Sequence, residues 1–140
     1  MNIDSLERFV EAQEHTYSIA LKEIQNGKKC SHWMWYVFPQ LRGLGKSSTA
    51  YKYGISGLEE AKAYLDHPLL SERLYEICAA LLSHKGKSVC SIFGITDAMK
   101  LKSSMTLFSL TTDGYTVFNE ILDSFFDGKP DEITLKLTNG

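Results

Sequence analysis

The amino-acid sequence predicts an all-α fold: a compact helical domain of about six to eight helices with an ordered connector rich in glycine and aromatic residues. Three observations favour this fold. Apolar residues recur three and four positions apart along most of the chain, helix-capping residues interrupt that pattern, and no pair of strand-like segments is evident. The 140 residues fit a single domain, residues 1–140, because no linker or low-complexity tract divides them.

The first predicted helix runs from about Asp4 to Gln25. Asp4 is an acceptable N-cap, Glu7 completes a pattern that resembles a capping box, and Asn26-Gly27 suits the carboxyl end of a helix. One stripe of this helix should face the core, and it consists of Leu6, Phe9, Val10, Gln13, Tyr17, Ala20, Leu21 and Ile24.

Residues 30–54 form the predicted connector. The dense apolar and aromatic run Trp33–Phe38 stands before Pro39, and glycines punctuate the chain from Gly43 onward. This composition predicts ordered irregular structure with one or two short turns of helix, the second near Ser48 to Tyr53. A buried strand is the alternative, although no partner strand is evident elsewhere.

Helical signals are regular after the connector. Ser56 and Glu59 form a capping box, Pro68 suits the first turn of a helix, and Thr96 and Thr116 are predicted N-caps. The predicted helices run from Ser56 to Asp66, from Pro68 to His84, from Ser88 to Phe93, from Thr96 to Phe108 and from Thr116 to Phe126, and a last short helix starts at Pro130.

The composition indicates a cytoplasmic protein without membrane association. Its longest apolar runs are far shorter than the ~20 residues of a membrane span, and its first residues lack the features of a signal peptide. An odd number of cysteines, Cys30, Cys78 and Cys90, without a CxxC spacing favours reduced thiols. The histidines have no ligand spacing with one another or with cysteine, so we expect neither a metal nor a cofactor.

Basic residues are concentrated in one part of the chain. No acidic residue lies between Glu23 and Glu59, and that interval contains Lys28, Lys29, Arg42, Lys46 and Lys52. The total charge of −2 gives no general attraction to nucleic acid, which we do not expect as a partner. The interval is either a solvated basic loop or an anion-binding surface. In the second case, Arg42 and Lys46 should lie on the same side as Lys28 or Lys29.

The stretch Gly43–Ser47 lies inside this basic interval. Gln40 occupies the position where a P-loop needs its first glycine, so the stretch is not a Walker motif. Its glycines could still let backbone amides face an anion, with Arg42 and Lys46 beside them, whereas an ordinary turn is the alternative. We count His32, Gln40, Arg42 and Lys46 among the candidate ligand-binding residues.

Four further side chains are candidates, each with a structural alternative. Trp35, beside cations, could stack on a flat ring, or it could belong to the core. Lys100 and Ser104 share a helical stripe with Asp97, so they could form a nucleophile pair or contact a ligand, or Lys100 could form a surface salt bridge. Glu14 lies beside the stripe of the first helix, where partial burial would tune it as a general acid or base and solvent exposure would leave it without a role.

Four stretches of the chain together resemble one family, the domain of unknown function numbered 1810. They are residues 9–14 (FVEAQE), 31–47 (SHWMWYVFPQLRGLGKS), 64–69 (YLDHPL) and 100–108 (KLKSSMTLF). The resemblance covers nearly the whole chain and implies a mainly helical, bacterial protein, but it implies no activity. A weaker similarity, carried by residues 13–20 and by His67-Pro68, links the chain to the NADAR family of N-glycosidases, and it would make Glu14 an acid in catalysis.

Two functions remain open. In the first, residues 28–48 pack against the first helix and residues 100–108 to form a pocket for an anionic small molecule, nucleotide-like or ribose-phosphate-like, with N-glycosidase-type hydrolysis through Glu14. Arg42 and Lys46 would hold the phosphate and Trp35 would stack on the ring. In the second, the same basic and aromatic segment recognises a protein partner without chemistry.

Overall fold

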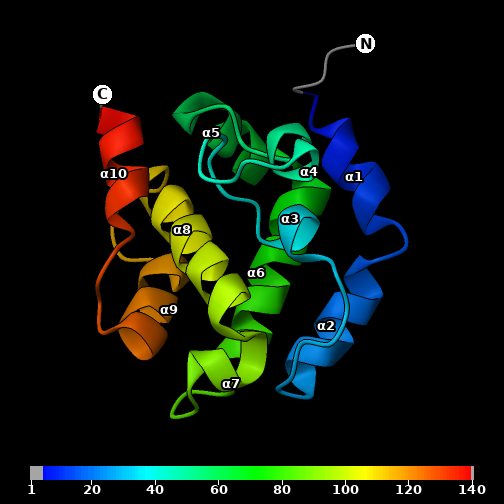
Figure 1. Ribbon diagram of the computed structural model, residues 1–140, viewed down its shortest axis with the longest axis vertical. Helices are drawn as coiled ribbons and strands as arrows, with labels where there is room; N and C mark the ends of the chain where they lie inside the picture. Colours follow the sequence, from blue (N-terminus) through cyan, green and yellow to red (C-terminus); the bar gives the residue numbers. More distant parts are fainter. Residues whose placement is uncertain (1–4, 140) are drawn as a thin grey trace.

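Helices make up the structure of residues 5–139, the part of the chain that the computed structural model describes (Figure 1). The all-α prediction is confirmed. The ten helices of this part exceed the predicted number because the first predicted helix is broken and the connector forms two short helices. Their bounds are α1 (Glu7–Gln13), α2 (Tyr17–Gln25), α3 (Met34–Val37), α4 (Ser48–Lys52), α5 (Leu58–Asp66), α6 (Pro68–Leu82), α7 (Val89–Phe93), α8 (Ile95–Leu110), α9 (Val117–Phe126) and α10 (Glu132–Asn139). Among these helices, none combines the length and hydropathy required to cross a bilayer.

The continuous helix predicted at the start of the chain is wrong, because α1 ends at Gln13 and α2 begins at Tyr17. The Gln13 side chain is buried and donates from Nε2 to the Tyr36 carbonyl at 2.7 Å and to the Tyr64 hydroxyl at 3.0 Å. The break therefore occurs where a polar side chain turns inward to satisfy its hydrogen bonds inside the fold. The predicted N-cap, Asp4, lies outside the described residues.

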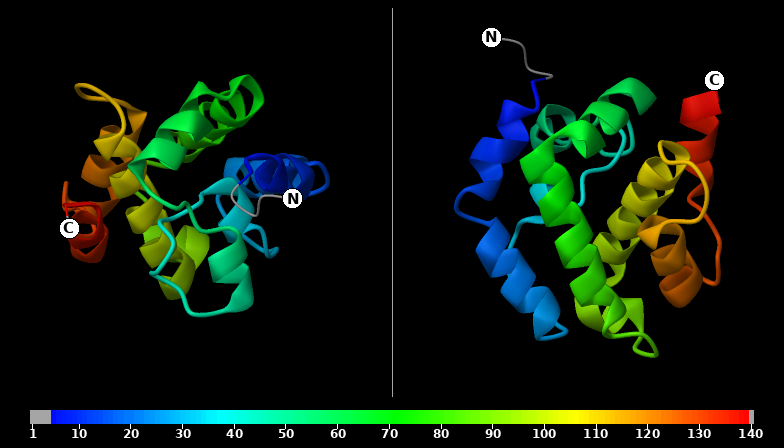
Figure 2. Two further views of the ribbon diagram at one scale, coloured as in Figure 1. Left: turned by 90° about the horizontal axis from the view of Figure 1, so that it is seen from above. Right: turned by 180° about the vertical axis from the view of Figure 1, so that it is seen from behind.

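Two long helices, α6 and α8, form the centre of the fold (Figures 1 and 2). Helix α6 contacts α1, α2, α5 and α9, and α8 contacts α5, α7, α9 and α10. Residues 103–108 of α8 are all buried, as expected for a helix with neighbours on most sides. The Phe108 ring lies 5.3 Å from Tyr64 of α5 and 5.6 Å from Phe118 of α9, measured between ring centroids.

The connector between α2 and α5 is ordered, as predicted, and it contains α3 and α4. Much of its aromatic run is core, since the exposed fraction is at most 3% for Trp33, Met34, Val37 and Phe38. The strand that was the alternative here amounts to one parallel bridge between Leu41 and Ile55. The connector thus supplies both hydrophobic core and a short piece of backbone pairing.

Glu23, near the end of α2, holds the first part of the connector. Its carboxylate accepts hydrogen bonds from the Cys30 amide at 2.8 Å, the Ser31 amide at 3.0 Å, the Ser31 hydroxyl at 2.6 Å and Trp33 Nε1 at 2.8 Å. Partial burial by itself raises the pKa of Glu23, but these hydrogen bonds outweigh it and lower the pKa to about 2. The carboxylate is therefore ionised at neutral pH and anchors residues 30–33.

Two helices begin at residues other than the predicted ones. Gly57 rather than Ser56 is the N-cap of α5, and the Ser56 amide instead donates to the Glu60 carboxylate at 2.9 Å. Helix α8 starts directly after Gly94, whose φ of 81° suits glycine, so Thr96 lies inside the helix. At α8 the positive φ of Gly94 allows the chain to change direction just before the helix begins, whereas the φ of 170° at Gly57 is extended backbone that other residues also adopt.

Candidate functional site

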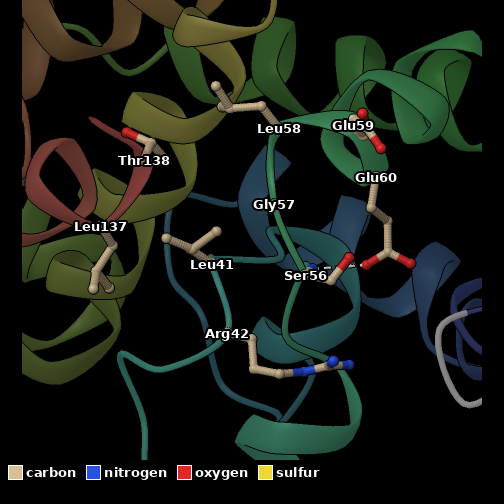
Figure 3. A pocket seen from close by; sticks show the side chains of 9 residues that line it. All are labelled: Leu41, Arg42, Ser56, Gly57, Leu58, Glu59, Glu60, Leu137 and Thr138. Atoms are coloured by element: carbon tan, nitrogen blue, oxygen red, sulfur yellow. Dashed lines mark hydrogen bonds between the residues drawn. The ribbon is translucent and has the colours of Figure 1, made fainter. Parts of the chain in front are cut away.

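A pocket of about 490 Å³ opens between the connector, the start of α5 and the end of α10, and we call it the α5 pocket (Figure 3). Its volume is typical of small-molecule sites. The connector contributes Leu41 and Arg42, and α10 contributes Leu137 and Thr138. The other described lining residues come from the start of α5 and the residues just before it: Ser56, Gly57, Leu58, Glu59 and Glu60.

Backbone pairing fixes the connector wall of the pocket. The Arg42 amide donates to the Ile55 carbonyl at 2.7 Å, and the Ile55 amide donates to the Gln40 carbonyl at 2.9 Å. The two segments approach so closely that a Cβ at Gly54 would lie 2.7 Å from the Arg42 Cα. A side chain at position 54 would therefore push the wall apart, and glycine keeps Arg42 in place.

Arg42 is the cationic side chain of the described lining, and α4 positions it. Its Nε donates to the Tyr51 carbonyl at 3.0 Å, and its guanidinium carbon lies 4.5 Å from the centroid of the Tyr51 ring. Hydrogen bonding and cation–π contact from the same residue restrict the rotamers that Arg42 can adopt. A guanidinium held in this way binds carboxylate or phosphate groups with a smaller loss of side-chain entropy.

Glu60 has a structural role at the rim of the pocket. Its two carboxylate oxygens each accept a hydrogen bond of 3.0 Å from Arg8, and both side chains are nearly buried, with exposed fractions of 8% and 6%. The other donors of Arg8 reach the carbonyls of Lys52 at 2.7 Å, Gly54 at 2.9 Å and Ser5 at 2.8 Å. Arg8 therefore neutralises Glu60 and ties α1 to α5 and to the end of the connector.

Glu59 is the second carboxylate of the lining, and it is exposed. It lies in the first turn of α5, where a negative charge is favoured by the helix dipole. The hydroxyl groups of Ser56 and Thr138 add neutral polar groups to the lining. The α5 pocket thus offers one guanidinium, one exposed carboxylate and two hydroxyls beside three leucines.

The structure brings Trp35 and Lys100 together in a different place, which we call the Trp35–Lys100 cluster (Lys29, Trp35, Asp97 and Lys100). Asp97 accepts from Lys29 Nζ at 2.8 Å and from Lys100 Nζ at 3.2 Å, and Lys100 Nζ lies 4.2 Å from the centroid of a Trp35 ring. Burial alone raises the pKa of Asp97, but the hydrogen bonds and charges of the two lysines outweigh it and lower the pKa.

The Trp35 indole is packed against other groups of this chain. Besides Lys100, it lies against Gly45, where a Cβ would be 3.0 Å from Trp35 Cη2. The salt bridge between Lys100 and Asp97 was the structural alternative for Lys100, and it is present. The ring is half-buried among these contacts.

Ser104 and Gln40 are buried, and neither lies in the described lining of the α5 pocket. The Ser104 Oγ has no hydrogen-bond partner among the described residues, so it is not bonded to Lys100 and no Ser–Lys pair is formed there. Gln40 contributes its backbone carbonyl to the wall of the pocket, through the bond with Ile55.

Glu14, His32 and Lys46 are exposed, and the described lining of the α5 pocket includes none of them. Glu14 is the C-terminal flanking residue of α1. Of the candidates proposed from the sequence, only Arg42 lines the pocket. Within residues 5–139, no three His, Cys, Asp or Glu side chains gather closely enough to hold a metal ion.

Sequence reasoning missed the start of α5 and the end of α10 as parts of the site. Ser56 and Glu59 were interpreted only as helix caps, and Leu137 lies nearly a hundred residues from Arg42 in the chain. One local signal was present, because Gly54 precedes Ile55, which pairs with Arg42, and a glycine there indicates close backbone approach.

Comparison with known proteins agrees with the fold but provides no activity. A family described as "Protein of unknown function (DUF1810)" matches residues 3–138. The chain is similar to the conserved hypothetical protein Rv1873 from Mycobacterium tuberculosis, whose crystal structure is known. The two chains are 46% identical, the match covers 99% of each, and the TM-score is 0.95. No curated protein matches the chain.

Proposed function

Because the chain belongs to the family of proteins of unknown function DUF1810, whose description carries no activity, we propose from geometry alone that this protein binds a small anionic molecule in the α5 pocket. The observation that carries the proposal is Arg42, which Tyr51 holds at the edge of a pocket large enough for a small ligand. Phosphate esters such as nucleotides and ribose phosphates, the ligands expected from the sequence, belong to this class.

The described lining of the pocket includes a cationic side chain, Arg42, that can contact an anion. Arg8 neutralises Glu60, and the other carboxylate of the described lining, Glu59, is exposed. The amino end of α5 adds a partial positive charge, which Glu59 offsets in part. Lys29 and Lys100 are paired with Asp97, and they support the fold rather than a ligand in this proposal.

Binding without catalysis is the form of the function that the geometry supports best. An N-glycosidase would need an acid at the ligand, and Glu14 lies exposed outside the described pocket lining. The alternative of a protein partner bound through the aromatic run has less support, because most of that run is buried. A bacterial, cytoplasmic setting remains part of the proposal, and the three free cysteines are consistent with it.

A thermal-shift and calorimetric screen tests the proposal. The panel contains inorganic phosphate, ribose 5-phosphate, adenosine monophosphate, acetate and hexanoate at constant ionic strength. An anion at 100 times its Kd should stabilise the protein by about 2.7 kcal/mol. Arg42→Ala should weaken its binding by about tenfold or more, because a charge-assisted hydrogen bond contributes about 1.5–3 kcal/mol.

Lys46→Ala is the matched control, since Lys46 is an exposed cation of the same connector outside the described lining. It should leave binding unchanged. If Arg42→Ala and Lys46→Ala bind every anion of the panel as the parent does, anion binding in the α5 pocket is wrong. If Lys46→Ala alone weakens binding, the anion site lies at the stretch Gly43–Ser47 instead.

A further inference from the structure

The segment that carries α4, residues 42–54, forms a small lobe on the surface, and we call it the α4 lobe. Its two ends lie side by side, because the Arg42 amide donates to the Ile55 carbonyl at 2.7 Å. The view from above shows the lobe at the edge of the molecule (Figure 2, left). Surface loops with adjacent ends and internal packing are frequently functional.

Contacts within the α4 lobe and at its base fix its shape. The Ser47 hydroxyl caps α4 by accepting a hydrogen bond from the Ala50 amide at 3.0 Å. A Cβ at Gly45 would lie 2.6 Å from the Ala50 Cβ and 3.0 Å from Trp35 Cη2, so the loop before α4 packs closely on both. Because Ala50 is buried, one side of α4 faces the fold and the opposite side faces solvent. A partner therefore meets a surface that is already formed.

The solvent side of the α4 lobe combines one aromatic ring with two cations. Tyr51 has an exposed fraction of 55%, and Lys46 and Lys52 are exposed as well. Lys52 follows Tyr51 directly, and Lys46 occupies the position before the N-cap, which commonly packs against the fourth residue of a helix, here Tyr51. The Arg42 guanidinium lies 4.5 Å from the centroid of the Tyr51 ring and helps to hold the ring in place.

The two lysines of the α4 lobe keep their positive charge without a carboxylate beside it. No acidic residue lies between Glu23 and Glu59 in the sequence. Among residues 5–139, no ion pair joins Lys46 or Lys52 to a carboxylate. Lys52 Nζ instead lies 5.3 Å from the centroid of the Tyr53 ring. The lobe therefore presents positive charge that a negatively charged partner can complement.

We propose that the α4 lobe is a docking surface for an acidic segment of a partner protein. Carboxylates of the partner bind Lys46 and Lys52, and an apolar side chain of the same segment covers the Tyr51 ring. Tyrosine is enriched at protein interfaces because its ring offers a large contact area at a small cost in side-chain entropy. This surface is separate from the aromatic run Trp33–Phe38, most of which is buried, and it does not depend on anion binding in the α5 pocket.

The charges and rings of the lobe favour an acidic protein segment over a nucleic acid. Proteins that bind single-stranded nucleic acid contact a series of phosphates and stack successive bases on several aromatic rings. The solvent side of the α4 lobe offers two lysines and one well-exposed ring, that of Tyr51. The whole chain also carries a charge of −2, which gives a long polyanion no general attraction. A short acidic segment needs only the local positive charge.

Fluorescence anisotropy with a labelled peptide tests the proposal. The probe is a short peptide in which glutamate alternates with leucine, and the reference peptide has glutamine in place of glutamate. The acidic peptide should bind more tightly than the reference, and its affinity should fall as salt rises. Replacing both lysines, Lys46→Ala with Lys52→Ala, should weaken its binding about fivefold or more. Reversing both charges, Lys46→Glu with Lys52→Glu, should abolish its binding.

Two further sets of variants separate the lobe from the net charge of the protein and the ring from the cations. Lys22→Glu with Lys129→Glu is the matched control, because both lysines are exposed, lie outside the lobe and change the net charge equally. This control should bind the acidic peptide as the parent does. Tyr51→Ala should weaken binding about threefold or more, and Tyr51→Phe should restore it, because the ring supplies the contact.

Three results would overturn the proposal. If the acidic peptide binds no better than the reference, or binds the charge-reversed lobe as it binds the parent, docking of acidic segments on the α4 lobe is wrong. If a thymidine oligonucleotide binds through Lys46 and Lys52 more tightly than the acidic peptide, the surface recognises nucleic acid instead. If inorganic phosphate at constant ionic strength displaces the peptide, the peptide occupies a small-anion site and not the lobe.

Discussion

The segment between α2 and α5 has two halves, residues 28–38 and residues 39–57. Both contain basic and aromatic residues, but the contacts of these side chains differ. In the first half, Lys29 pairs with Asp97, and Trp33 donates to Glu23. In the second half, Arg42 lies beside a pocket of about 490 Å³. A basic and aromatic segment can thus contribute to the core or line a pocket, and contacts with other parts of the chain decide which.

The largest expected effect comes from removing the carboxylate that supports the second half. Glu60→Ala leaves the Arg8 guanidinium nearly buried without its partner, and this should lower the free energy of unfolding by about 3–5 kcal/mol. Urea denaturation measures it. Glu59→Ala is the control, because Glu59 is exposed and its loss should change stability by less than about 0.5 kcal/mol. Equal effects of the two variants would show that the Arg8–Glu60 pair does not hold the pocket rim.

An intermediate effect is expected from Glu23, which anchors the first half, and its contribution to the free energy of unfolding depends on pH. The pKa of Glu23 is about 2 in the folded protein against an ordinary 4.5, so its stabilisation is present above pH 4.5 and is lost as the pH falls toward 2. Because Glu23 is partly exposed, we expect a contribution of about 1–3 kcal/mol after solvent screening. Stability curves of the parent and of Glu23→Gln should differ above pH 4.5 and converge by about pH 2.

The difference between those two curves isolates Glu23 from Asp97, whose pKa is lowered as well and whose titration both proteins share. A difference that stays constant from pH 7 to pH 2 would contradict the assignment, because it would mean that the carboxylate contributes equally when protonated. Glu23 would then not be the anchor of the first half, and the two halves would no longer differ in this respect.

The smallest expected effect is at the centre of the fold, next to the Trp35–Lys100 cluster. Ser104 lies one helical turn after Lys100, and its buried Oγ has no partner among the described residues. Ser104→Ala should therefore be neutral or stabilise the protein by up to about 1 kcal/mol, since it removes an unsatisfied polar group. Ser103→Ala is the matched control, because the Ser103 hydroxyl donates to the Met99 carbonyl at 3.1 Å. Thermal unfolding should place Ser104→Ala above Ser103→Ala, and the reverse order would indicate that Ser104 is hydrogen-bonded in solution.

Part of the candidate site could be predicted from the sequence, and part could not. Arg42 was identifiable because it lies in a long interval without carboxylates, beside glycines that allow close backbone approach. Leu137, Thr138 and Leu58 were not, because an exposed leucine or threonine on a helix has no distinctive spacing. The break between α1 and α2 was also hidden, since the apolar stripe continues across it and only the buried partners of Gln13 indicate it.

By itself, the sequence determined the helical class and several helix ends, because these depend on residues close together in the chain. Pro68 opens α6, Thr116 and Asn119 form the capping box of α9, and Gly27 with its φ of 77° follows α2. Only the tertiary structure decided which charges are neutralised and where space remains. Lys29 pairs with Asp97, Arg8 pairs with Glu60, and Arg42 lines the same pocket as the end of α10, and each of these arrangements joins residues far apart in the chain. Local propensity carries no information on such distances, since they follow from how the helices pack around a shared core.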